Sequence, residues 1–253
     1  MLELATVTAA SLLAGFVDAI VGGGGLVLVP ALFGVFPSAA PATLFGTNKG
    51  AAVWGTAWAG WQYARRVTLP WAALAPAVAA ALLGALAGAW AVTQVSADGL
   101  RRALPFVLLA VLAYTLARKD LGRTHAPRHT GRVEAGLAVA IGATVGFYDG
   151  FFGPGTGSFF VFLMVRLLGY DFLHASACAK LLNTATNVSA LGLFAWAGHV
   201  WWHIALVMAV ANVAGSLFGT RLALKHGAGF VRGVFIVVVG ALIAKTAWDA
   251  YLR

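Results

Sequence analysis

The stretch Gly15–Gly25, GFVDAIVGGGG, carries an apolar run into four consecutive glycines. A second stretch, Gly146–Gly157, GFYDGFFGPGTG, opens on the same Gly-Phe-x-Asp pattern and also leads into glycines. Glycine permits positive φ and proline removes an amide donor, so both clusters should interrupt a helix. The apolar runs that follow, near 26–36 and 158–168, have about 11 residues each and span only ~16 Å as helix, against a hydrocarbon core of ~30 Å. The sequence therefore predicts two broken helices within a membrane.

Composition supports a membrane protein. Of the 253 residues, 61% are hydrophobic and 10% are charged, and the mean hydropathy is +0.88. Soluble domains carry about 25% charged residues, so this chain could not cover a water-facing surface. The start, Met1-Leu2-Glu3, lacks a positive leader region, and we expect the first apolar run to be retained as a membrane segment. We predict an all-α polytopic integral membrane protein, with residues 1–253 forming one membrane domain.

The cysteine count and the charge exclude other classes. A single cysteine, Cys178, excludes an internal disulfide and a cysteine-cluster metal site. The formal net charge is +9, but the cations stand mainly in short connections between apolar runs, where they act as topology signals. We therefore expect no nucleic-acid partner, no cofactor and no metal. The expected partners are the lipid bilayer and a small anionic substrate, and a homo-oligomer is compatible with the sequence.

The apolar runs give ten helical segments, or about eight membrane crossings when the short half-helices are not counted separately. The first half has runs near 4–21, 26–36, 42–63, 70–93 and 100–117. The second half has runs near 133–152, 158–168, 174–197, 202–224 and 229–250. A polar linker, 118–131, separates a first repeat, 1–117, from a second repeat, 132–253.

An ungapped offset of 131 residues relates the two halves. At this offset Asp18 corresponds to Asp149, Lys49 to Lys180 and Arg101 to Arg232, and the glycines at 15, 22, 24, 84 and 88 also find partners. Glycine matches arise easily by chance in a chain with 31 glycines. Matches of charged residues are hard to obtain by chance in a chain so poor in charge. The sequence therefore predicts an internal duplication, the usual construction of secondary transporters.

Charged connections predict the orientation of the halves. Arg65-Arg66, the linker and the 221–232 connection are the most basic, and the positive-inside rule places them in the cytoplasm. Arg65-Arg66 precedes the last two segments of its half, whereas the basic connection of the second half lies between the last two. This difference predicts that the repeats are inverted, with both termini outside; Arg101-Arg102 does not fit this arrangement.

The glycine breaks predict a substrate site. Irregular backbone at membrane depth requires protein or a water-filled cavity to satisfy it, and paired breaks in two halves point to a transporter binding site. Half-helices starting near Leu26 and Ser158 would direct free N–H groups and positive dipole ends to a common point that favours an anion. The alternative is that glycines only allow close helix packing, which we favour for Gly84 and Gly88 and for their counterparts 215 and 219.

Ionisable residues in apolar segments are costly and are usually functional. Asp18 and Asp149 each lie four residues before a break, where they could bind a proton or a cation, or cap the break. Lys180 shares a helix face with Asn183 and Asn187, and the first half offers similar chemistry at Thr47-Asn48-Lys49. The alternative for the lysines is that they extend to the membrane interface.

The two long motifs, with Pro30, Gly46-Thr47-Asn48, Lys180-Leu181-Leu182-Asn183 and Asn187, resemble the two repeat signatures of the sulfite exporter TauE/SafE family. The resemblance covers essentially the whole chain. It implies an inner-membrane permease with a duplicated core, associated with sulfite, sulfoacetate or related sulfonates. It does not select one of these anions.

Together these observations predict a secondary transporter of a small sulfur-containing anion, with Asp18 and Asp149 as proton-coupling or break-capping residues. A passive anion channel is one alternative. An intramembrane hydrolase using Ser158 is another, which we do not favour because no Gly-x-Ser-x-Gly motif is present. The expected substrate-binding residues are Gly22, Gly23, Gly24, Gly25, Asn48, Lys49, Gly153, Gly155, Thr156, Gly157, Lys180, Asn183 and Asn187.

Overall fold

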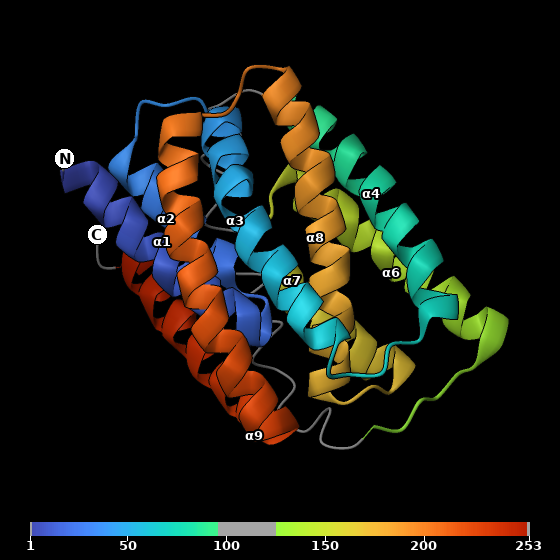
Figure 1. Cartoon of the computed structure of the whole chain (residues 1–253). Coiled ribbons are helices and arrows are strands. Elements are labelled where there is room, and N and C mark those ends of the chain that lie inside the picture. The colour runs from blue at the N-terminus through green and yellow to red at the C-terminus, as the bar shows by residue number, and fades with distance from the viewer. Residues whose placement is uncertain (1, 96–124, 252–253) are drawn as a thin grey trace.

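The computed structural model describes residues 2–95 and 125–251, and all regular structure in these ranges is helical (Figure 1). The first half contains α1 (Leu2–Val21), α2 (Gly24–Val35), α3 (Pro41–Ala64) and α4 (Trp71–Thr93). The second half contains α6 (Gly131–Phe151), α7 (Thr156–Leu163), a π-helical turn η1 (Met164–Leu168), α8 (Phe172–Trp196) and α9 (Trp202–Tyr251). The predicted segment 100–117 and Arg101 lie outside the described residues.

Most predicted segments are found within a few residues of their expected ends. The predicted boundary between 202–224 and 229–250 falls inside α9, where Gly227 has a φ of 70° and interrupts the helix. Figure 1 shows the chain reversing its direction there. Of the predicted linker, residues 125–130 are described and have no regular structure, and α6 begins at Gly131.

Both predicted helix breaks are present. Gly22 has a φ of 76°, and Gly153 and Gly155 have φ values of 88° and 80°. The half-helices begin at Gly24 and Thr156, two residues before the predicted starts at Leu26 and Ser158. Glycine is tolerated at the start of a helix because its helix-propensity cost applies to the helix interior. The prediction therefore placed the helix starts too late.

Hydropathy identifies three of the described helices as long and apolar enough to cross a membrane: Leu2–Val21, Trp71–Thr93 and Trp202–Gly227. Shorter apolar helices cover Gly24–Val35 and Thr156–Leu168. The long helices α3 and α8 carry buried lysine, asparagine and threonine side chains, which lower their mean hydropathy. The polar residues in these two helices are therefore enclosed by the other helices rather than by lipid.

Glycine contacts join the two halves in equivalent pairs. A Cβ on Gly84 would lie 2.4 Å from the Ala143 carbonyl oxygen, and one on Gly215 would lie 1.9 Å from the Leu12 carbonyl oxygen. Adding 131 to Gly84 gives Gly215, and subtracting 131 from Ala143 gives Leu12. The two contacts are therefore equivalent, with the roles of the halves exchanged. Gly88 and Gly219 meet the carbonyl oxygens of α6 and α1 in the same way, at Phe147 and Phe16. The packing interpretation of these glycines is confirmed, and the equivalence supports the duplication; the repeat boundaries and the inversion stay predictions.

These contacts predict that Gly215→Ala destabilises the protein. The new methyl group would overlap backbone, and such overpacking costs about 1–3 kcal/mol. The matched control is Gly192→Ala, where no atom lies within 4 Å of the added Cβ and helix propensity favours alanine. Thermal denaturation of the detergent-solubilised protein should show a lower melting temperature for Gly215→Ala only. Equal melting temperatures would contradict the close approach of α9 and α1.

Candidate substrate-binding site

The two glycine breaks touch each other. The Ser158 amide donates a 3.1 Å hydrogen bond to the Gly22 carbonyl, and the Ser158 hydroxyl donates to the Val21 carbonyl at 3.0 Å. A Cβ on Gly22 would lie 2.3 Å from the Gly157 carbonyl carbon. Only glycine at both positions allows two backbones to approach this closely. The break of the first half is therefore fixed against the half-helix of the second.

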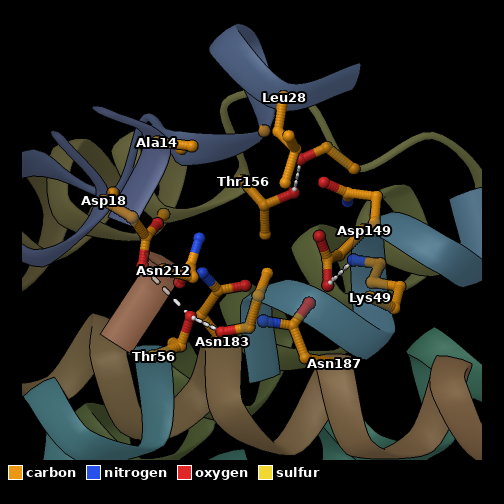
Figure 2. Close-up of a pocket in the computed structure, with 17 residues that line it drawn as sticks. Ala14, Asp18, Leu28, Lys49, Thr56, Asp149, Thr156, Asn183, Asn187 and Asn212 are labelled. Carbon is orange, nitrogen blue, oxygen red and sulfur yellow. Dashed lines mark hydrogen bonds and ion pairs between the residues drawn. The ribbon is translucent and has the colours of Figure 1, made fainter. Parts of the chain in front are cut away.

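A small cavity lies beside this contact (Figure 2). The space open to the centre of a water-sized sphere is about 20 Å³, close to what one water molecule needs. The cavity in the described conformation is therefore very small. The cavity is lined by Ala14, Asp18, Gly22, Gly24, Gly25, Leu28, Asn48, Lys49, Ala52, Thr56, Asp149, Gly153, Thr156, Gly157, Asn183, Asn187 and Asn212.

Two buried ion pairs cross between the halves. Lys49 Nζ lies 2.7 Å from Asp149 Oδ2, and Lys180 Nζ lies 2.9 Å from Asp18 Oδ2. Each lysine therefore pairs with the aspartate of the other half, and the pairs are equivalent at the offset of 131. Unpaired charges at this depth would be very costly. The two lysines and two aspartates together are electrically neutral.

The two pairs differ in their surroundings. Lys49 and Asp149 both line the cavity, whereas Lys180 is fully buried and does not reach it. Asp18 Oδ2 also accepts a 3.1 Å hydrogen bond from the Thr56 hydroxyl. Asp149 Oδ2 accepts no hydrogen bond in the described structure and depends on its ion pair. Figure 2 shows Asp149 with Lys49 on one side of the cavity and Asp18 near Thr56 on the other.

Neutral hydrogen-bonding groups complete the lining. Gly24, Gly25 and Gly157 belong to the first turns of α2 and α7, whose N–H groups lack intrahelical acceptors and carry the positive end of the helix dipole. The Asn48 Oδ1 atom is buried and has no hydrogen-bond partner in the described part of the chain. Rotating this amide by 180° would present its NH₂ group as a donor instead. The site can therefore offer donors to an anion without any change of charge.

Most of the predicted site residues meet at the cavity. Gly23, Gly155 and Lys180 do not line it: the two glycines shape the breaks, and Lys180 is occupied by Asp18. Sequence analysis missed Thr56 and Asn212. Thr56 is the counterpart of Asn187 at the offset of 131, which could have identified it. Asn212 corresponds to Ala81, and only its polarity in an apolar run marks it.

Ser158 carries the contact between the breaks rather than facing a histidine. Its hydroxyl is buried and donates to Val21. His174 lies against Asp171, and His199 Nδ1 lies 3.1 Å from the Thr43 hydroxyl. The described residues thus provide no hydrogen-bonded serine–histidine pair at Ser158 of the kind that activates a nucleophile.

Comparison with known proteins identifies the family. The family model for sulfite exporter TauE/SafE matches residues 7–246. The chain belongs to this family. It is 36% identical over 241 residues to the probable membrane transporter protein YfcA of Escherichia coli K12, covering 95% of this chain and 88% of that protein. It is 35% identical to the probable membrane transporter protein ORF9 of a Sinorhizobium species, over 97% of this chain and 93% of that protein. No solved structure matched the chain.

The predicted resemblance to the TauE/SafE family is confirmed, and the chain is a membrane transporter of the TauE/SafE type. A relative from Haemophilus influenzae, 31% identical over 95% of its own length, is also named a probable membrane transporter protein. The apolar helices agree with a membrane location.

In this TauE/SafE protein, removing one partner of the Lys180–Asp18 pair should be more damaging than removing both. Lys180→Met would leave the Asp18 carboxylate with only the Thr56 hydroxyl, and breaking a buried pair costs about 3–5 kcal/mol. Adding Asp18→Asn should recover a large part of the loss in melting temperature. Lys225→Met, at an exposed lysine, serves as the control and should change little. If the single and double variants melt alike, the pairing does not govern stability.

Proposed function

We propose that the chain is a proton-coupled secondary transporter of a small sulfur-containing anion, such as sulfite, sulfoacetate or a related sulfonate, in the bacterial inner membrane. The observation that carries the proposal is the Lys49–Asp149 pair, because it is the pair whose two members both line the cavity. The half-helix N-termini on the same cavity support an anionic ligand. The family supports the sulfur-containing class.

Charge balance is the basis of the proposed coupling. The cavity with its two ion pairs is neutral, so an anion entering it alone would add a buried net charge. When Asp149 takes up a proton, Lys49 is released from its carboxylate and can pair with the anion. The sum of the charges then stays zero when one proton and one monovalent anion bind together. In the described conformation, the Asp149 carboxylate pairs with Lys49 in place of the anion.

The asymmetry of the pairs assigns different roles to equivalent residues. Asp18 keeps two donors, Lys180 and Thr56, and Lys180 does not reach the cavity. We assign this pair to holding α1, α3 and α8 together. Asp149, which has fewer partners and whose lysine also lines the cavity, is assigned to proton exchange. A passive channel would need no such exchangeable carboxylate.

The pH dependence of binding tests this proposal. With a sulfonate that has no group titrating near neutrality, wild-type affinity should weaken about tenfold per pH unit as the pH rises, because one proton must be taken up with each anion. Asp149→Asn mimics the protonated carboxyl group, so its affinity should be independent of pH. Isothermal titration calorimetry on detergent-purified protein at several pH values gives the measurement.

Two comparisons make the result decisive. Lys49→Ala should abolish binding, whereas Asp18→Asn should retain the pH dependence if it folds. Loss of the pH dependence in Asp18→Asn but not in Asp149→Asn would exchange the proposed roles of the two pairs.

In proteoliposomes, accumulation of the anion should collapse with an uncoupler; flux that only equilibrates the anion would indicate a channel. Binding of matched carboxylates but no sulfur oxyanion would overturn the substrate class.

A further inference from the structure

Outside the cavity, three metal-ligand side chains meet where the connection between the halves passes the start of α8. His125 lies in that connection, Asp171 is the N-cap of α8, and His174 lies in its first turn. One ligand atom from each of the three lies within 4.8 Å of the other two. Sequence analysis predicted no metal site because Asp171 and His174 lie 46 residues or more from His125.

The two oxygens of the Asp171 carboxylate make different contacts. Oδ1 accepts a 2.8 Å hydrogen bond from the His174 amide and so caps the helix. Oδ2 faces both imidazoles, 2.8 Å from His174 Nδ1 and 4.0 Å from His125 Nδ1. The two rings are stacked with their centroids 4.0 Å apart. The cap therefore fixes the carboxylate, and Oδ2, which is in hydrogen-bond contact with His174 Nδ1, is the oxygen that faces both imidazoles.

We propose that His125, Asp171 and His174 bind a divalent late transition-metal ion, with Zn²⁺ as the expected occupant. Two imidazoles and one carboxylate with an open fourth position are a common zinc ligand set, and metal–ligand distances of about 2.0–2.2 Å in a tetrahedron require ligand atoms roughly 3.3–3.6 Å apart. The two distances from Oδ2 to the imidazole nitrogens bracket this range. A turn of the stacked rings together with a small shift of the side chains would direct both nitrogens at one ion. The partial exposure of His125 gives the ion a path from solvent.

The location gives the site a consequence for transport. Main-chain hydrogen bonds already attach the connection to the segment before α8, from Ala126 to the Gly169 carbonyl at 3.0 Å and from Arg128 to the Leu168 carbonyl at 2.9 Å. A metal ion bound by His125 and α8 would strengthen this attachment. Because α8 also carries Lys180 and Asn187 of the central site, the bound ion should restrain movement of α8 relative to the connection. We expect the ion to slow transport without entering the substrate cavity.

Metal binding can be measured without reference to transport. Protein purified with its affinity tag removed would be dialysed against micromolar Zn²⁺ and its metal content determined; Co²⁺ in place of Zn²⁺ provides a visible absorption spectrum. Wild type should bind about one ion per chain at the three-ligand site. His125→Ala should weaken binding about tenfold or more, and because His125 is partly exposed this variant should fold normally. His129→Ala, in the same connection but outside the cluster, is the matched control.

The site is overturned if wild type binds no ion, or if His125→Ala and His174→Ala both bind like wild type. Substrate counterflow in proteoliposomes tests the consequence: Zn²⁺ should slow exchange by wild type and His129→Ala but not by His125→Ala. Inhibition that persists in His125→Ala would overturn the restraint on α8. Since metal content is read independently, failure of the anion-transport proposal would leave this result interpretable.

Discussion

The buried lysine–aspartate pairs that cross between the halves are the interaction on which the rest of the structure depends. An ionised side chain in an apolar interior requires a partner of opposite charge. Here Lys49 takes its partner from α6 and Lys180 takes its partner from α1. Each lysine finds its carboxylate in the other half, so these pairs hold the two halves together. Glycine-mediated contacts of α4 with α6 and of α1 with α9 allow the approach that brings these charges together.

The same pairs connect architecture to transport. A lysine that is held by a carboxylate in one state and by a substrate anion in another must reach the cavity, and Lys49 does. In the equivalent pair Lys180 is buried away from the cavity, and Asp18 has a further partner in Thr56. Duplication thus supplies two similar ion pairs. In the proposed mechanism one pair holds the helices together, and the other exchanges its partner.

The sequence predicted the helices and their breaks because these follow from local chemistry. Hydropathy identifies the long apolar runs, and glycines such as Gly22 and Gly153 permit the positive φ that interrupts a helix. It also grouped most of the cavity residues, because the breaks and the polar face of α8 are visible as motifs. It did not predict that the lysines pair with the aspartates. Asp18 and Lys180 are 162 residues apart, and their meeting depends on how the halves dock, which no local pattern encodes. Asn212 was missed for the same reason.

The most direct test of the central claim is infrared difference spectroscopy of the purified protein with and without a sulfonate. If the anion replaces the Asp149 carboxylate at Lys49, ligand binding near neutral pH should produce the carbonyl band of a newly protonated carboxyl group. This band should be absent in Asp149→Asn and retained in a folded Asp18→Asn variant. Ligand binding by wild type without a new carboxyl band would show that the ion pair stays intact, and would contradict the exchange of partners at Lys49.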